Sequence, residues 1–340
     1  PLFCFARKRL KGIELMNIGL DLGYSAVKLV ADSRRKTFPS VVGTPEMGRF
    51  SLDQQENHIV LIRPERVLVG EGAMTQSRFV NRREDRAWIE SAEYYHLFLA
   101  ALTELTTATV ADLLLVTGLP VAFYSDKARL IDRLVGVHKV NREGRHAQTF
   151  KVSECRVIPQ PFGALLAVAL DDRGRIADHA LATGAVGVID IGGKTTNLLS
   201  VDRLAEIGRE TESVSVGAWD VVRAVRSYLA HRCPNLELRD HQIVEAIVSR
   251  QVRYYGQQVD LKPVVDAALE PMANQVIAQA TQLWTSGAGL DAILVAGGGA
   301  LLLGPFLKAH FRHARIVTDP VFANAEGYWK LAQRLSSSID

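Results

Sequence analysis

Two segments far apart in this chain share one design. Residues 18–30 (IGLDLGYSAVKLV) and residues 187–202 (GVIDIGGKTTNLLSVD) each begin with an apolar, β-branched run that ends in an aspartate. Glycine and small hydroxyl residues follow, and then a second apolar run. This pattern predicts a strand, a tight turn and a returning strand in each segment. Internal repetition of this kind indicates a fold built from two similar halves.

The two turns contain the residue types that phosphate binding requires. Gly23, Gly192 and Gly193 would let backbone N–H groups approach an anion. Asp21 and Asp190, at the strand ends, would hold Mg²⁺ through its water ligands. One such turn alone is most often only a turn, because glycine and aspartate are common turn residues. The occurrence of two favours phosphate binding.

A third glycine-rich segment lies late in the chain, at residues 293–307 (ILVAGGGALLLGPFL). It predicts a strand that runs through Gly297, Gly298 and Gly299 into a helix, which suits close approach of a nucleotide to the backbone. The segment lacks the spacing of dinucleotide-binding sites, and none of the three segments has the Walker pattern. In this order, the three segments predict an ATPase whose nucleotide lies between two similar halves.

These segments resemble the nucleotide-binding motifs of the actin superfamily. The resemblance implies an α/β, actin-like fold of two ribonuclease H-like domains with a nucleotide cleft between the halves. The first segment resembles the phosphate-1 motif, with Asp21 as the metal-side carboxylate, Ser25 at the phosphate turn and Lys28 on the returning strand. Tyr24 is a further expected contact. Burying Lys28 without a partner would be costly, so a nucleotide phosphate is its expected partner.

The second segment resembles the phosphate-2 motif, and the late glycines resemble the adenosine motif. Asn197 departs from the pattern, since segregation ATPases of this family often carry an acidic residue there. Glu245, on a helix expected over residues 240–250, is a candidate for the ribose, with a solvated helix face as the alternative. The nucleotide contacts that the resemblance implies are Asp190, Gly192, Gly193, Lys194, Thr195, Gly297, Gly298 and Gly299.

Residues 157–170 (VIPQPFGALLAVAL) resemble the helix that connects the halves, where the family places a residue that orients the attacking water. Gln160 is the candidate; alternatively it is an ordinary polar residue beside Pro161 at the start of a helix. An amide is a poor general base, so we expect slow turnover unless neighbouring subunits assist. Asp190 is the second catalytic candidate, because it would handle charge together with the metal.

Within the superfamily, the chain most resembles ParM-like and archaeal actin-like proteins of plasmids. Residues 319–333 resemble their second connecting helix, with Ala325 and Gly327 packed against the first. The implied organisation is an N-terminal extension (1–15) outside the fold, a first domain (16–160) with a small insertion at about 37–85, and a second domain (161–322), with a helix at 323–340 that completes the first. Between these motifs the sequence predicts helices over 88–109, 124–134 and 262–284, and a buried strand over 112–120.

Composition limits the other function classes. With 340 residues, 48% hydrophobic and 23% charged, the chain can bury two cores without disulfides. A net charge of +3 gives no reason to expect direct nucleic-acid binding. The three cysteines show no metal-ligand spacing, and a reducing cytoplasm is the expected location. No apolar run reaches the roughly 18 residues that a membrane span requires.

Three functions remain open at this point. The favoured one is an ATPase, using ATP or GTP with Mg²⁺, that polymerises with itself and moves DNA through a separate DNA-binding adaptor protein. The second is a small-molecule kinase, because IDIGGKTTN also resembles the ATP-binding hairpin of sugar kinases. A kinase needs an aspartate base in a substrate loop, whereas Asp126 and Asp132 lie within a helical pattern. The third is a regulatory or chaperone-type ATPase that does not polymerise.

Overall fold

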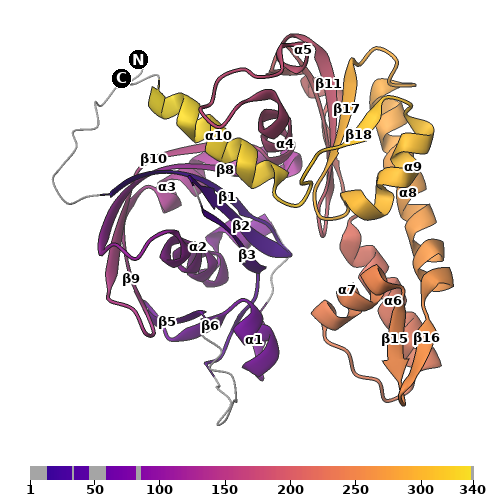
Figure 1. The fold of residues 1–340 in the computed structure, drawn as a ribbon, viewed down its shortest axis with the longest axis horizontal. Helices are drawn as coiled ribbons and strands as arrows, with labels where there is room; N and C mark the ends of the chain where they lie inside the picture. Colours follow the sequence, from indigo (N-terminus) through magenta and orange to yellow (C-terminus); the bar gives the residue numbers. More distant parts are fainter. Residues whose placement is uncertain (1–13, 33, 46–58, 82–85, 338–340) are drawn as a thin grey trace. The chain divides into compact units, whose positions relative to one another are not determined.

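The computed structural model describes residues 14–32, 34–45, 59–81 and 86–337 (Figure 1). Most of the expected N-terminal extension and the last three residues of the expected C-terminal helix lie outside these ranges. The chain forms two compact units: one contains the described residues up to Ala182 and those from Phe322 onward, and the other is Thr183–Val321. The units divide after Ala182, whereas the sequence predicted a division after residue 160.

In the first unit, the described strands form a mixed sheet that curls around one helix, α2 (Ala92–Leu105) (Figure 1). Alternate residues of β8 are buried on opposite faces: Leu113 and Leu115 in the main core with α2, and Leu114 and Val116 against α10 (Ala323–Ser337). A strand buried on both faces explains the continuous apolar run DLLLV. The strand order is β3 (Arg34–Pro39), β2 (Ala26–Ala31), β1 (Glu14–Leu22), β8 (Val110–Leu119), β10 (Gln148–Pro159), β9 (Gly136–Arg142), β5 (Ile59–Arg63), β6 (Val67–Val69), β4 (Val42–Gly43) and β7 (Val80–Asn81).

Two helices of this unit are shorter than the sequence predicted. The helix expected over 88–109 is a 3-10 turn, η1 (Arg86–Glu90), followed by α2. Ser91 separates them, because its hydroxyl accepts a hydrogen bond from Tyr94 N at 3.1 Å and begins α2 as its N-cap. Likewise, the helix expected over 124–134 is η2 (Val121–Asp126) followed by α3 (Lys127–Leu134). The remaining helices are α1 (Glu71–Gln76), α4 (Gln160–Ala169) and α5 (His179–Thr183).

Helices α4 and α10 cross with their backbones in contact. A Cβ atom at Gly327 would lie 1.8 Å from Gly163 O, so only glycine fits at the crossing. This confirms the predicted role of Gly327 and places α4 in the first unit. The prediction for Ala325 was wrong, because Ala325 packs with Val30 and Trp329 instead of α4. Ala325 and Gly327 are two residues apart, and that step turns the side chain to a different face of α10.

The second unit has a smaller mixed sheet in the order β13 (Ala205–Glu206), β12 (Thr196–Asp202), β11 (Ala185–Ile191), β17 (Ala292–Ala296) and β18 (Ala314–Ile316), with β14 (Glu212–Val214) also paired to β12. Ile189, Ile191, Ile293 and Val295 on one face of this sheet share a core with the helices. These helices are α6 (Ala218–Arg232), α7 (Asp240–Ser249), α8 (Lys262–Trp284) and α9 (Ala300–His310); η3 (Gly208–Glu210) and the hairpin of β15 (Gln251–Tyr254) and β16 (Gln257–Asp260) complete the unit.

Candidate functional site

The first predicted hairpin is formed by β1, β2 and the turn between them. Asp21 of β1 lies opposite Lys28 of β2 in the ladder, and Lys28 Nζ donates to Asp21 Oδ2 at 3.1 Å. Both side chains are largely buried. The partner of Lys28 in this structure is therefore Asp21, whereas the sequence analysis expected a nucleotide phosphate. An ion pair within the hairpin is enough to explain the burial of this lysine.

Hydrogen bonds from the next segment hold the turn of the first hairpin. Ser40 Oγ donates to Gly23 O at 2.6 Å, and Ser40 N donates to Ser25 O at 3.1 Å. A Cβ atom at Gly23 would lie 3.3 Å from Ala26 O and 3.4 Å from Lys28 Nζ. The backbone of the turn thus lies close to the lysine ammonium.

Gln160 is the first residue of α4 and lies beside the same carboxylate. Its Nε2 donates to Asp21 Oδ1 at 3.4 Å, which is a long and weak hydrogen bond. Tyr328 of α10 donates its hydroxyl to Gln160 O at 3.3 Å. Since the Gln160 amide nitrogen is directed to Asp21, the amide oxygen is left to accept a hydrogen bond from water. The structure therefore brings Asp21, Lys28 and Gln160 together from three different elements.

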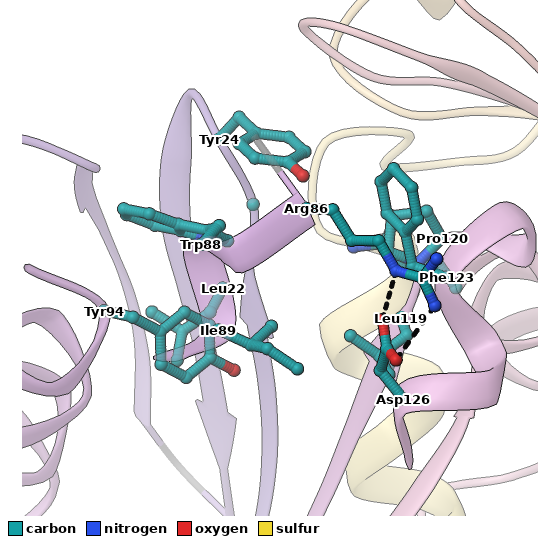
Figure 2. A pocket seen from close by; sticks show the side chains of 13 residues that line it. Leu22, Tyr24, Arg86, Trp88, Ile89, Tyr94, Leu119, Pro120, Phe123 and Asp126 are labelled. Carbon is teal, nitrogen blue, oxygen red and sulfur yellow. Dashed lines mark hydrogen bonds and ion pairs between the residues drawn. The ribbon is translucent and has the colours of Figure 1, made fainter. Parts of the chain in front are cut away.

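A small pocket adjoins this cluster and is lined in part by Gly23, Tyr24 and Gln160 (Figure 2). Its volume is about 20 Å³, which is room for about one water molecule. Figure 2 shows Tyr24, Trp88 and Tyr94 on one side of the pocket. The ring centroids of Tyr24 and Trp88 are 6.0 Å apart, so the phosphate-1-like turn is anchored on an aromatic cluster.

An ion pair that sequence reasoning missed lies on the other side of this pocket (Figure 2). Arg86 donates to both carboxylate oxygens of Asp126, from Nε at 2.8 Å and from Nη2 at 3.0 Å. These hydrogen bonds lower the pKa of the Asp126 carboxyl. Asp126 is one of the two aspartates, with Asp132, that the sequence analysis considered as a kinase base and placed within a helical pattern. Held ionised in a bidentate pair with Arg86, it is poorly suited to take a proton from a substrate hydroxyl.

The second hairpin comprises β11, β12 and the intervening turn, and its carbonyl groups bind the start of α6. Gly192 N donates to Thr195 O at 2.9 Å and closes the turn. Gly192 O accepts from Ala218 N at 3.0 Å, and Gly193 O accepts from Trp219 N at 2.9 Å. Lys194 and Thr195 are half-buried in this turn. The turn is thus fixed by main-chain contacts on its carbonyl side.

The glycine run, Gly297–Gly299, packs directly on the second hairpin. Gly297 has a φ of +86°, and a Cβ atom there would lie 2.4 Å from Ile191 O and 2.5 Å from Asp190 Oδ1. Gly299 N donates to Ile191 O at 2.9 Å. Gly298 differs, because a Cβ atom there would meet nothing within 4 Å. The run therefore places an open stretch of backbone beside the buried Asp190, at the start of α9.

The structure also shows the environment of Asn197 and Glu245, the two remaining residues that the sequence analysis singled out. Asn197, the departure from the family pattern, lies opposite Ser213 of β14 and accepts a hydrogen bond from Ser213 Oγ at 2.6 Å. At the position where segregation ATPases often carry an acidic residue, the Asn197 amide is therefore bonded to the neighbouring strand. Glu245 is exposed on α7, a helix that packs on α6 and β15. Its contact with a ribose stays a prediction.

The acidic residues fit a hydrated cation better than a caged one. Within the described ranges, no three His, Cys, Asp or Glu side chains form a cluster that could enclose a metal ion. Mg²⁺ usually keeps several waters and is held by one or two carboxylates together with phosphate oxygens. Asp21 and Asp190 are each a buried carboxylate beside a glycine turn of their own unit, and their binding of Mg²⁺ stays a prediction. None of the helices in the described part of the chain has the length and apolar character to cross a membrane.

Two family profiles match the chain in succession. One, described as the N-terminal domain of actin-like proteins, covers residues 19–163. The other, described as the C-terminal domain of the archaeal actin homologue, MreB-like, covers residues 188–309. The chain belongs to the actin-like proteins. A comparison with curated proteins gave no match.

Solved structures show the same fold over nearly the whole of this actin-like chain. A non-polymerisable quadruple mutant of pCBH ParM is 23% identical, with a TM-score of 0.80 over 94% of this chain and 100% of that chain. A 15-stranded ParM filament from Clostridium botulinum is 23% identical, with a TM-score of 0.78 over 95% and 100%. The archaeal actin homologue Ta0583 in complex with ADP is 22% identical, with a TM-score of 0.77 over 95% and 100%. These comparisons confirm the predicted actin-like fold.

The predicted site residues of this actin-like chain form two groups. In the first unit, Asp21, Lys28 and Gln160 share direct contacts. In the second unit, Asp190 lies under the backbone of Gly297. Nucleotide binding at these two groups stays a prediction.

Proposed function

We propose that this actin-like protein binds and hydrolyses ATP or GTP with Mg²⁺, and that the bound nucleotide controls its assembly into filaments. The observation that carries the proposal is a buried aspartate beside a glycine turn in each unit. Asp21 is 5% exposed and Asp190 is 4% exposed. Burying a carboxylate is costly unless a cation or hydrogen bonds compensate. In each unit, such a buried carboxylate beside a glycine turn is suited to holding a hydrated Mg²⁺ that accompanies a phosphate.

The contacts of the first hairpin suggest what its residues do when phosphate arrives. Lys28 neutralises Asp21 in this structure, at 3.1 Å. A phosphate oxygen would offer the ammonium a second anionic partner and would leave Asp21 to bind the waters of a metal. Mg²⁺, when bound, would supply charge neutralisation on the phosphate oxygens. The carboxylate and the ammonium would thus serve as a matched pair of charges for a metal–phosphate ligand.

Gln160 is the residue that we propose to orient the attacking water. Its amide nitrogen is directed to Asp21, so its amide oxygen is oriented by a residue of the phosphate-1-like turn. The adjoining pocket has room for about one water. An amide cannot take up a proton to a useful extent, so Gln160 would position the water and turnover would be slow.

Two of the structural neighbours support the proposal that nucleotide binding controls assembly. One neighbour was solved as a filament of ParM, and another as a complex with ADP. We propose that this chain polymerises with itself in the cytoplasm and moves plasmid or other DNA through a DNA-binding adaptor protein. The net charge of only +3 favours an adaptor over direct DNA contact.

The test of nucleotide binding compares the buried aspartate of each hairpin with an exposed aspartate of the second hairpin. Asp21→Asn and Asp190→Asn should each weaken Mg²⁺-dependent ATP binding by about 1.5–3 kcal/mol, the range for a lost charge-assisted contact. Asp202→Asn is the matched control, because Asp202 ends the same strand pair as Asp190 and is exposed. Titration of a fluorescent ATP analogue with and without Mg²⁺ measures the difference. Equal affinities in all four proteins would remove the proposal.

A further inference from the structure

A larger cavity lies in the first unit and shares no lining residue with the pocket beside Gln160. Its volume is about 420 Å³, within the range of about 300–1,000 Å³ that small-molecule pockets occupy. It lies among β3, the start of β5, the end of β6 and the last turn of α2, within the curled part of the sheet that Figure 1 shows. We call it the cationic cavity.

Three cationic side chains of this cavity converge on a single carboxylate. Arg142 Nη1 donates to Glu104, while Lys36 Nζ and Arg145 Nη2 each lie 3.8 Å from a Glu104 oxygen. The Arg142 and Glu104 side chains are 7% and 12% exposed. Glu71 is the other acidic residue of the lining. Three positive and two negative groups leave the lining with an excess of one positive charge.

Contacts with the end of α2 explain why two of the three cationic residues lie here, but not the third. Arg142 and Arg145 bind the end of α2, since Arg145 donates to Thr103 O and Arg142 to Thr103 Oγ1 at 3.5 Å. Cations are favourable at a helix C-terminus. That explains Arg142, whose pair with Glu104 is buried. It does not explain Lys36, whose side chain has no hydrogen bond to another described residue and whose Nζ lies too far from Glu104 to donate to it.

The cations also act unfavourably on one another. Burial and then the neighbouring charge of Arg142 lower the pKa of Arg145, and Arg34 acts in the same direction. Arg34 lies two residues before Lys36 on β3, so both residues point to the same side of the sheet. A concave surface with surplus positive charge attracts anions, and guanidinium groups bind phosphate oxygens with directed hydrogen bonds.

We propose that the cationic cavity binds a small phosphorylated anion, with Lys36 and Arg145 as direct contacts and Arg142 as the buried support. Lys36 and Arg145 line the cavity with side chains that are 55% and 33% exposed, whereas the Arg142 guanidinium is buried and held by Glu104. The size of the cavity suits one compact ligand. This inference is independent of the hairpins and of nucleotide hydrolysis.

Calorimetric titration of the full chain with pyrophosphate, in the absence of Mg²⁺, tests the proposal. Lys36→Gln and Arg145→Gln should each weaken binding about tenfold or more, the effect of losing one charge-assisted contact. Arg35→Gln is the matched control, because Arg35 lies between Arg34 and Lys36 but its guanidinium lies over the Phe322 ring, 4.1 Å from the centroid. Its binding should match that of the unmodified chain.

Lys28→Gln separates this cavity from the first hairpin, where pyrophosphate could also bind. Binding that survives Lys28→Gln and is lost in Lys36→Gln and Arg145→Gln supports the cationic cavity. Binding lost in Lys28→Gln and kept in the two cavity variants would overturn the proposal, as would the absence of pyrophosphate binding. If pyrophosphate does not bind but the cavity variants reduce self-assembly, the cavity receives an acidic side chain of another copy, and the small-anion proposal fails.

Discussion

The backbone of Gly297 lies against the carboxylate of Asp190, so closely that a Cβ atom at residue 297 would be 2.5 Å from Asp190 Oδ1. The contact joins the glycine run to the second hairpin, two segments that the sequence separates widely. The left-handed conformation of Gly297, with a φ of +86°, is part of the same arrangement. Neighbouring glycines of the run therefore have different roles, which substitutions can distinguish.

Gly297→Ala should lower the free energy of unfolding by about 1–3 kcal/mol, because the methyl group is both sterically excluded and placed on a backbone that disfavours it. Gly298→Ala should leave stability unchanged within about 0.5 kcal/mol, since its Cβ meets open space. If a nucleotide approaches this backbone, Gly298→Ala should nevertheless weaken ATP binding. Urea denaturation and nucleotide titration of both variants measure these effects. A Gly298→Ala protein with unchanged ATP affinity would count against nucleotide contact at the run.

Gln160→Ala should leave ATP affinity nearly unchanged and reduce the hydrolysis rate about 10–100-fold, because only the water loses its orienting group. Tyr328→Phe is the control for a structural role, since it removes only the hydroxyl that donates to Gln160 O. Single-turnover hydrolysis and thermal unfolding of both variants provide the comparison. If Gln160→Ala loses affinity, turnover and stability together, Gln160 is a structural residue at the start of α4.

The crossing of α4 and α10 is sensitive to a single methyl group. Gly327→Ala would gain about 1 kcal/mol from helix propensity but must move a backbone carbonyl that lies 1.8 Å from the new atom. We expect a net loss of about 1–3 kcal/mol, as for overpacking of a core. Exposed Gly289, where an added Cβ meets nothing within 4 Å, is the control for a general glycine effect. Equal stability of Gly327→Ala and Gly289→Ala would contradict the close crossing.

Buried histidines make the first unit less stable in acid. His138 Nε2 donates to Leu134 O at 2.8 Å, so in the neutral ring Nδ1 accepts from the Tyr95 hydroxyl at 3.1 Å. Burial lowers the pKa of His138, and also that of His96, below the ordinary value of 6.5. As pH falls below 6.5, the unfolded chain binds protons that the folded chain does not, and stability decreases.

The free energy of unfolding should therefore decrease between pH 7.5 and pH 5.5, and His138→Phe should reduce that decrease while keeping the ring contact with Phe98. His146 is exposed, so His146→Gln should leave the size of this decrease unchanged. Urea denaturation at the two pH values provides the measurement. A decrease of the same size in His138→Phe and in the unmodified chain would show that His138 does not contribute.

The local sequence pattern was enough to predict both hairpins. The register of the first hairpin also predicts an ion pair that we did not infer. Asp21 and Lys28 are opposite each other once the turn is centred on Gly23 to Ser25, so their ion pair follows from strand pairing alone. Helix boundaries were less predictable. Hydrophobic periodicity continues through η1 into α2, and only the hydrogen bond of Ser91 shows where the α-helix begins.

Relationships between distant segments were beyond single-sequence reasoning. Arg86 and Asp126 are 40 residues apart, and neither lies in a recognisable motif. The contact of Gly297 with Asp190 depends on the parallel pairing of β11 with β17, which no local pattern specifies. The cationic cavity likewise draws on β3, α2 and β9, and no local pattern brings their charged residues together.

Sedimentation with Mg²⁺–ATP, with Mg²⁺–ADP and without nucleotide, over a wide range of protein concentration, shows whether the nucleotide controls filament assembly. A nucleotide-controlled filament has open head-to-tail contacts, so the protein should become pelletable above a critical concentration in ATP and stay in the supernatant without nucleotide. Asp190→Asn should not pellet, and Asp202→Asn should behave like the unmodified chain. Protein that never pellets, and that releases ADP only when a small hydroxyl compound is added as acceptor, would contradict the account and identify a kinase.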